Sequence, residues 1–158
     1  MNTDKTPLEA IFEEWWKGLA SDRGGRADLR RSATVLEIQL LPAFYGLARR
    51  LPHSAEGSRL DWLAAAAGVL AHVKEDAGEQ AFAELLAAGG EGHPAFSDLR
   101  FRRLLAADRP DELLSSVRRA VQLARGRAPV GQLGGDLLYW GDNARKRWAR
   151  GYYASSED

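Results

Sequence analysis

Apolar residues recur along most of this chain at the three- and four-residue spacing of amphipathic helices. Thr6 and Pro7 form a helix start signal, and the apolar side chains that follow fall on one stripe: Leu8, Ile11, Phe12, Trp15, Trp16 and Leu19. Comparable patterns predict short helical pieces within 27–51 and helices over 58–73, 80–88, 98–106, 110–124, 133–140 and 142–153. No stretch alternates with period two, so we predict no sheet and an all-α fold, a compact bundle of eight or nine short helices.

A glycine-rich turn at residues 89–92 follows the predicted helix 80–88 and interrupts this pattern. We therefore predict an N-terminal helical lobe over residues 1–90 and a C-terminal basic helical lobe over 91–158, which together form one unit. Side-chain caps are predicted at the starts of three helices: Ser58, Ser97 and Asp142.

The net charge of zero conceals a strong segregation of sign. Between Leu99 and Arg150 there are twelve basic and five acidic residues, a balance of +7, whereas 51–98 holds two basic and eight acidic residues, a balance of −6. Arginine supplies 18 of the 22 cationic side chains, and its guanidinium binds phosphate in a bidentate manner. This pattern indicates a polyanionic partner.

Helical phase turns most of these cations toward solvent, because the apolar residues of each helix claim the inner face. The predicted outward positions are Arg100, Arg102, Arg103, Arg119, Lys146, Arg147 and Arg150, with Arg118 and Arg145 at the border of an apolar stripe. The acidic residues of this region cluster at helix starts, where capping and the helix dipole account for them: Asp108, Asp111, Glu112 and Asp142. The outer faces are therefore expected to keep an uncompensated positive field.

The chain offers few side chains for catalysis or metal binding. It has no cysteine, and its histidines are isolated in the sequence: His53, His72 and His93. His72 is one helical turn from Glu75 and Asp76, but two ligands without a third are a weak metal site. The paired carboxylates Glu13 and Glu14 are assigned to the solvent side of the first helix. We therefore predict no active site, no metal and no cofactor.

Three further features exclude other classes of protein. The glycines within 131–135 follow no strand and precede no Gly-Lys-Ser or Gly-Lys-Thr, so we interpret them as a turn at a helix boundary, not a phosphate-binding loop. The first residues lack the apolar segment of a signal peptide, and the longest apolar stretch, 63–73, is too short to span a bilayer. With the absence of cysteine, these features predict a cytoplasmic protein without a membrane partner.

Several strings of residues together resemble one protein family. In chain order they are Arg26-Ala27-Asp28-Leu29-Arg30-Arg31, Pro42-Ala43-Phe44-Tyr45, Arg100-Phe101-Arg102-Arg103-Leu104-Leu105, Asp111-Glu112-Leu113 followed by Arg118-Arg119, Asp136-Leu137, and Trp140 with Arg147-Trp148-Ala149 and Tyr152. In order and spacing the set resembles the CasB family, the small subunit of the type I-E CRISPR Cascade complex, over nearly the whole chain. One departure is Ala83-Glu84-Leu85, where the family often has Gly followed by a basic residue, so we expect no phosphate contact there.

The resemblance implies an all-helical, non-catalytic subunit that dimerises along the inner face of Cascade and helps to hold the opened DNA. Its expected partners are target DNA, CRISPR RNA, other Cascade subunits and a second copy of the chain. Phosphate contacts that ignore base sequence suit this role. Where motifs and helical faces overlap, the expected contacts are Arg30, Arg31, Arg102, Arg103, Arg109, Arg118, Arg119, Arg145, Lys146 and Arg147, with Arg26 and Lys74 added.

Two other hypotheses stay open at this point. A protein-interaction adaptor would dock its basic lobe on an acidic partner, or on the acidic 51–98 surface of a second copy, and would self-associate in a salt-sensitive manner without binding DNA. A sequence-specific helix-turn-helix regulator is disfavoured, because no helix interleaves Asn or Gln with its arginines.

Overall fold

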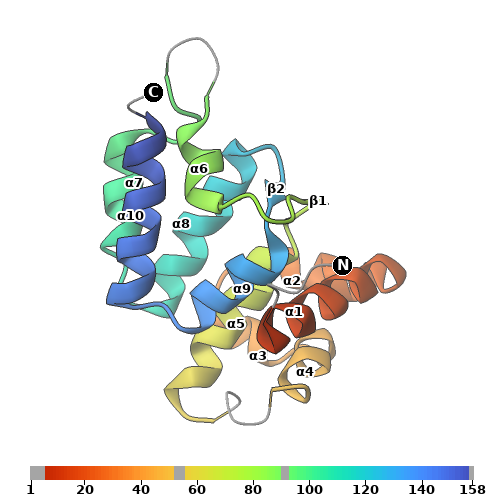
Figure 1. Ribbon diagram of the computed structural model, residues 1–158. Helices are drawn as coiled ribbons and strands as arrows, with labels where there is room; N and C mark the ends of the chain where they lie inside the picture. Colours follow the sequence, from red (N-terminus) through yellow and green to blue (C-terminus); the bar gives the residue numbers. More distant parts are fainter. Residues whose placement is uncertain (1–5, 52–55, 90–92, 157–158) are drawn as a thin grey trace.

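The computed structural model describes residues 6–51, 56–89 and 93–156, and these residues form ten α-helices (Figure 1). The elements are α1 (Pro7–Gly18), the 3₁₀ turn η1 (Leu19–Ser21), α2 (Arg23–Arg31), α3 (Val35–Gln39), α4 (Pro42–Ala48), α5 (Ser58–Leu70), β1 (Glu75–Asp76), α6 (Phe82–Ala87), α7 (Asp98–Leu105), α8 (Pro110–Leu123), β2 (Arg127–Ala128), α9 (Val130–Leu138) and α10 (Asp142–Ser156). The all-α prediction is confirmed. The helical pieces predicted within 27–51 are found as α2, α3 and α4, and α3 ends before Pro42, which cannot continue it. The ten helices of the described residues slightly exceed the predicted eight or nine.

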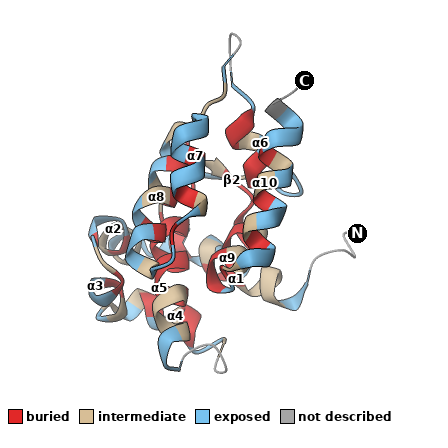
Figure 2. Cartoon of the chain, turned by 90° about the vertical axis from the view of Figure 1, so that its left-hand side faces the viewer, coloured by how far each residue is buried: buried red, intermediate tan, exposed pale blue. Residues whose placement is uncertain are grey.

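Helix α5 is the buried centre of the fold. Its residues 63–70 are all buried, and it packs against α2, α3, α4, α8 and α9. A helix that is covered on every side needs no polar face, which explains its run of alanines. Gly68 lets α3 and α8 pack close to α5, because an added Cβ would lie 2.6 Å from Cδ1 of Ile38 and 2.7 Å from Cδ1 of Leu114. In Figure 2 the exposed residues follow the outer sides of the surrounding helices, and the buried ones face inward.

The glycines within 131–135 belong to α9 itself, so their interpretation as a boundary turn was wrong. Helix α9 lies close against α1. A Cβ on Gly131 would lie 2.8 Å from Cβ of Glu9, and a Cβ on Gly134 would lie 2.5 Å from Cγ of Phe12. Glycine is a poor helix former, at about 1 kcal/mol less favourable than alanine. Here the close approach of two helices requires it, and this requirement outweighs the local preference.

Helix α1 begins and packs largely as its sequence predicts. The Thr6 hydroxyl accepts from the Glu9 amide at 3.2 Å, and the Glu9 carboxylate accepts from the Thr6 amide at 3.0 Å, which forms a capping box. The predicted apolar stripe is buried or half-buried. Glu13, however, is only 8% exposed, so its assignment to the solvent side was wrong. Because α9 and α4 both cover α1, burial extends beyond the stripe. Glu14 is exposed as predicted.

The prediction of no sheet was also wrong in one detail. Strands β1 and β2 form a two-residue parallel pair with Glu75 opposite Arg127 and Asp76 opposite Ala128. Two residues are too few to show any alternation in the sequence, so periodicity could not predict this pair. The pair joins the segment after α5 to the segment after α8.

Of the three predicted side-chain caps, one is found at the predicted residue. Ser97 caps α7 as predicted, since its hydroxyl accepts from the Arg100 amide at 3.3 Å. Ser58 and Asp142 are instead the first residues of α5 and α10.

Helix α6 packs against α10, and α9 packs against α1 and α5, so elements of both predicted lobes share one core. Most of the predicted boundary turn, residues 90–92, lies outside the described residues, and the division into two lobes stays a prediction.

The helices of the described ranges are not membrane spans. Within 6–51, 56–89 and 93–156, every helix is too short or too polar to cross a membrane.

Candidate nucleic-acid interface

The guanidinium of Arg118, on α8, is bound to the main chain of two other helices. Its Nε donates to the Gly68 carbonyl at 3.2 Å, its Nη2 to the Leu29 carbonyl at 2.7 Å, and its Nη1 to the Ser32 carbonyl. The last carbonyls of a helix have no partner within the helix and favour a cation. The carbonyls of Leu29 and Ser32 stand at the C-terminal end of α2, where Arg118 binds them. Burial lowers the pKa of Arg118 below its ordinary value. Arg118 thus joins α8, α5 and α2, and most of its donors are engaged inside the chain.

Arg26 and Arg145 have the same arrangement at two other helix ends. The acceptors are the carbonyls of Ala71 (3.0 Å) and Val73 (2.7 Å) for Arg26, and of Leu105 (2.7 Å) and Ala107 (2.8 Å) for Arg145. The Arg145 guanidinium also lies 5.7 Å from the ring centre of Trp140, which confirms its predicted place beside the aromatic stripe. These two residues and Arg118 therefore have a structural role that neither charge nor helical phase indicated.

Four other predicted contacts are exposed but form ion pairs. The pairs are Arg31–Asp28 (2.6 Å), Arg102–Asp98 (3.2 Å), Arg109–Glu112 (2.6 Å) and Arg147–Asp136 (2.7 Å). The expectation of uncompensated charge was wrong at Arg102, Arg109 and Arg147, because a carboxylate of the same helix, of the helix that follows directly, or of the neighbouring α9 reaches each of them. Exposed pairs contribute at most about 1 kcal/mol, so a phosphate can replace the carboxylate. Arg147 is held more firmly, since Asp136 is 13% exposed and also accepts from Trp148.

The remaining five predicted contacts are exposed, and within the described residues their side chains form no hydrogen bond or ion pair: Arg30, Lys74, Arg103, Arg119 and Lys146. Six cations outside the predicted set share this condition: Lys17, Arg23, Arg49, Arg100, Arg125 and Arg150. Helical phase had already placed Arg100 and Arg150 on outer faces. Exposed cations without an internal partner keep their full capacity for phosphate. The five predicted contacts among them are the strongest candidates for a nucleic-acid interface.

A small notch lies between α2 and the chain that leaves α5. It measures about 270 Å³ and is lined by Ala27, Arg30, Arg31 and His72. His72 is half-buried, and its Nε2 is buried without a hydrogen-bond partner in the described structure. Burial, followed by the charges of Arg118, Arg30 and Arg26, lowers the pKa of His72 to about 4. The imidazole is therefore neutral at pH 7, in a strongly positive environment.

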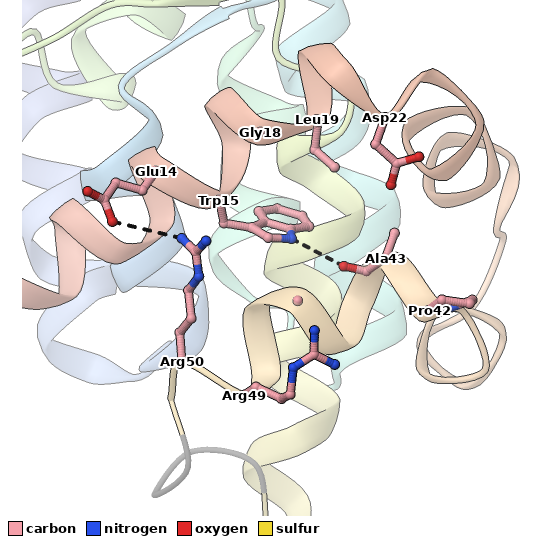
Figure 3. Close-up of a pocket in the computed structure, with 10 residues that line it drawn as sticks. Glu14, Trp15, Gly18, Leu19, Asp22, Pro42, Ala43, Arg49 and Arg50 are labelled. Carbon is pink, nitrogen blue, oxygen red and sulfur yellow. Dashed lines mark hydrogen bonds and ion pairs between the residues drawn. The ribbon is translucent and has the colours of Figure 1, made fainter.

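A second hollow, of about 320 Å³, lies between α1 and α4 (Figure 3). The Trp15 indole donates from Nε1 to the Ala43 carbonyl at 3.2 Å, and Arg50 reaches Glu14 at 3.9 Å. Arg49 lies at the edge of this hollow with no bond to another described residue. Because carboxylate and guanidinium groups both line it, this hollow does not favour one sign of ligand.

The described residues contain no cluster of three or more His, Asp, Glu or Cys side chains that could hold a metal ion. His72 has no such cluster around it. His53 lies outside the described residues, so its predicted isolation stays a prediction.

Comparisons with known proteins show the family of this chain and its fold. A family model described as CRISPR-associated protein Cse2 matches residues 25–153. A chain in the crystal structure of E. coli Cascade bound to a PAM-containing dsDNA target matches with a TM-score of 0.73 and 22% identity, over 98% of this chain and 99% of that chain. The crystal structure of CasB from Thermus thermophilus matches with a TM-score of 0.64 and 28% identity, over 94% and 99%. No curated protein matches.

Proposed function

The chain belongs to the CRISPR-associated Cse2 family, and from this membership we infer that it is a non-catalytic, nucleic-acid-binding structural subunit of a type I-E Cascade complex. In this role it works in the cytoplasm, contacts target DNA and CRISPR RNA, and lies beside other Cascade subunits and a second copy of itself. The similar chain of E. coli belongs to a Cascade bound to a DNA target, which supports the assignment.

The observation that carries the binding role is that five of the predicted contacts are exposed cations without internal partners. Arg103 on α7, Arg119 on α8 and Lys146 on α10 belong to three different helices of the bundle. Contacts of this kind neutralise phosphates without reading bases. In an R-loop the guide–target duplex is about as stable as the DNA duplex it replaces, so backbone contacts shift the balance toward the open form.

Co-purification tests the assignment to a complex. The full chain, expressed with the proteins and CRISPR RNA encoded beside it, should be recovered in a multi-subunit particle that contains this RNA. Recovery of the chain as a lone monomer that ignores DNA would contradict the assignment.

Charge variants test the binding role itself. The double variant Arg119→Gln, Lys146→Gln should weaken binding of DNA of any sequence and reduce the slope of log K against log salt by about 0.7–0.9 per lost phosphate contact. Arg49→Gln is the matched control, because Arg49 is also exposed and unpaired but lies outside the expected contacts. Equal binding by the double variant and the control would exclude these two residues from the interface.

A subunit of a complex must also contact protein, and α3 offers an apolar surface for this. Leu36 is 65% exposed and Leu40, directly after α3, is 73% exposed. The two leucines are about one helical turn apart and so lie on one side of the chain, and contiguous exposed apolar side chains are a feature of protein contact sites. This favours a protein neighbour here, so the adaptor hypothesis describes part of the same role. Salt-sensitive self-association without DNA binding would favour an adaptor alone.

A further inference from the structure

The notch between α2 and the end of α5 combines several features that favour an anion. Arg30 and Arg31 are exposed at its edge, and the guanidinium of Arg30 has no partner among the described residues. The notch, at about 270 Å³, is slightly smaller than the usual range for drug-sized ligands, which begins at about 300 Å³. A single charged group with part of its neighbouring chain therefore suits it better than a whole cofactor.

The internal arginines make this site more positive than its exposed residues alone would. Arg26 and Arg118 donate to main-chain carbonyls, which engages their N–H groups but leaves their charge in place. Both charges act on His72, together with that of Arg30. No carboxylate is among the groups that perturb His72.

Two nearby carboxylates, Asp28 and Glu37, offset part of the positive charge around the notch. Asp28 binds Arg31 at 2.6 Å in an exposed pair, and Glu37 acts on Arg118. Because the Asp28 pair is open to solvent, a phosphate can share or displace its guanidinium. A phosphodiester placed here gains a bidentate partner in Arg30 and a field from two guanidiniums fixed behind it.

We propose that this notch, lined by Ala27, Arg30, Arg31 and His72, binds a backbone phosphate of a nucleic-acid strand, with Arg30 as the direct contact and the His72 ring as one wall. The proposal rests on the nucleic-acid role inferred above and names one phosphate subsite within it. It also predicts that an anion in the notch offsets the arginine charges and so raises the pKa of His72 from about 4.

The test follows the His72 ring by NMR during pH titration of the full chain, with His72→Gln used to assign the signal. Oligothymidylate should raise the pKa of His72, and inorganic phosphate at high concentration should raise it by less. Arg30→Gln should abolish the rise with either ligand and weaken binding of the oligonucleotide. Arg49→Gln should leave both unchanged, since Arg49 lies at the other hollow. Both substitutions are at exposed positions and are expected to leave the fold intact.

The outcomes separate this subsite from the broader role. If the oligonucleotide binds but neither the pKa nor the chemical shift of His72 moves, the notch proposal is overturned and the nucleic-acid role stands. If Arg30→Gln behaves as Arg49→Gln does, the notch proposal is likewise overturned. If no oligonucleotide binds to any variant, both proposals fail.

Discussion

Replacing Arg118 with alanine should destabilise the protein far more than replacing its neighbour Arg119. The Arg118 guanidinium donates to three carbonyls, those of Gly68, Leu29 and Ser32, and all three residues are buried. A hydrogen bond to a charged group contributes about 1.5–3 kcal/mol. Because water can reach some of these carbonyls after truncation, we expect a loss of about 3–5 kcal/mol rather than the full sum of the three bonds.

For a protein of this length a loss of 1 kcal/mol lowers Tm by about 2–4 °C, so Arg118→Ala should unfold about 10 °C below the wild type. Arg119→Ala removes an exposed side chain without a partner and should change the free energy of unfolding by less than about 0.5 kcal/mol. Arg118→Lys should recover only part of the loss, because an ammonium cannot span three carbonyls as a planar fork does. Thermal unfolding followed by circular dichroism measures all three. An Arg118→Ala protein that unfolds within about 2 °C of the wild type would refute this account of the anchor.

Three further predictions concern packing, backbone strain and protonation. Gly134→Ala should destabilise by about 1–3 kcal/mol, because its Cβ would lie 2.5 Å from the Phe12 ring, whereas Gly135→Ala, whose nearest contact is 3.5 Å, should be neutral or stabilising in the same denaturant titration. Arg125 holds φ at +60°, in the left-handed region that favours glycine, so Arg125→Gly should raise stability by about 1 kcal/mol while it weakens DNA binding; an unchanged affinity would assign Arg125 no contact. The pKa of His72 is lowered in the folded chain from 6.5 to about 4, so the folded protein favours the neutral ring. The free energy of unfolding is therefore not reduced by His72 above pH 6.5 and falls as pH decreases toward 4. After allowance for the partial exposure of the ring, this loss amounts to about 1 kcal/mol. His72→Gln should flatten that part of a plot of Tm against pH, and a slope equal to that of the wild type would contradict the shift.

The sequence predicted the elements of the fold well wherever apolar spacing and start signals coincide. The stripe of α1 and its capping residue Thr6 are examples, as is the buried face of α8. It failed where a local preference conflicts with a tertiary contact. The glycines of α9 indicate a turn when taken alone, and only the approach of α1 explains why a helix contains them. Burial of Glu13 has a similar origin, since two helices cover α1 from different sides.

The candidate site was predictable only in part, because helical phase tells which side of a helix a residue occupies but not what it meets there. Arg119 and Lys146 were placed outward and are exposed. Arg118 was placed at the border of the apolar stripe of its helix, which is correct. Nothing in the sequence indicates, however, that carbonyls of α2 and α5 lie within hydrogen-bond reach of its guanidinium. The ion pair of Arg109 was missed because Glu112 was assigned to the helix start alone, and that of Arg102 because Asp98 lies just outside the segment 99–150 whose charges were counted.

The anchored and exposed cations are neighbours in sequence, and this arrangement bears on how the surface is built. Arg118 precedes Arg119, and Arg145 precedes Lys146. Adjacent residues on a helix point about 100° apart, so an arginine fixed to main-chain carbonyls also fixes the direction of the cation that follows it. The anchors require the guanidinium fork, while the exposed positions need only a positive charge that reaches a phosphate. Exchange of arginine for lysine should therefore be tolerated at 119 and harmful at 118, and the density of arginine in this chain has two physical causes, of which only one is the nucleic acid.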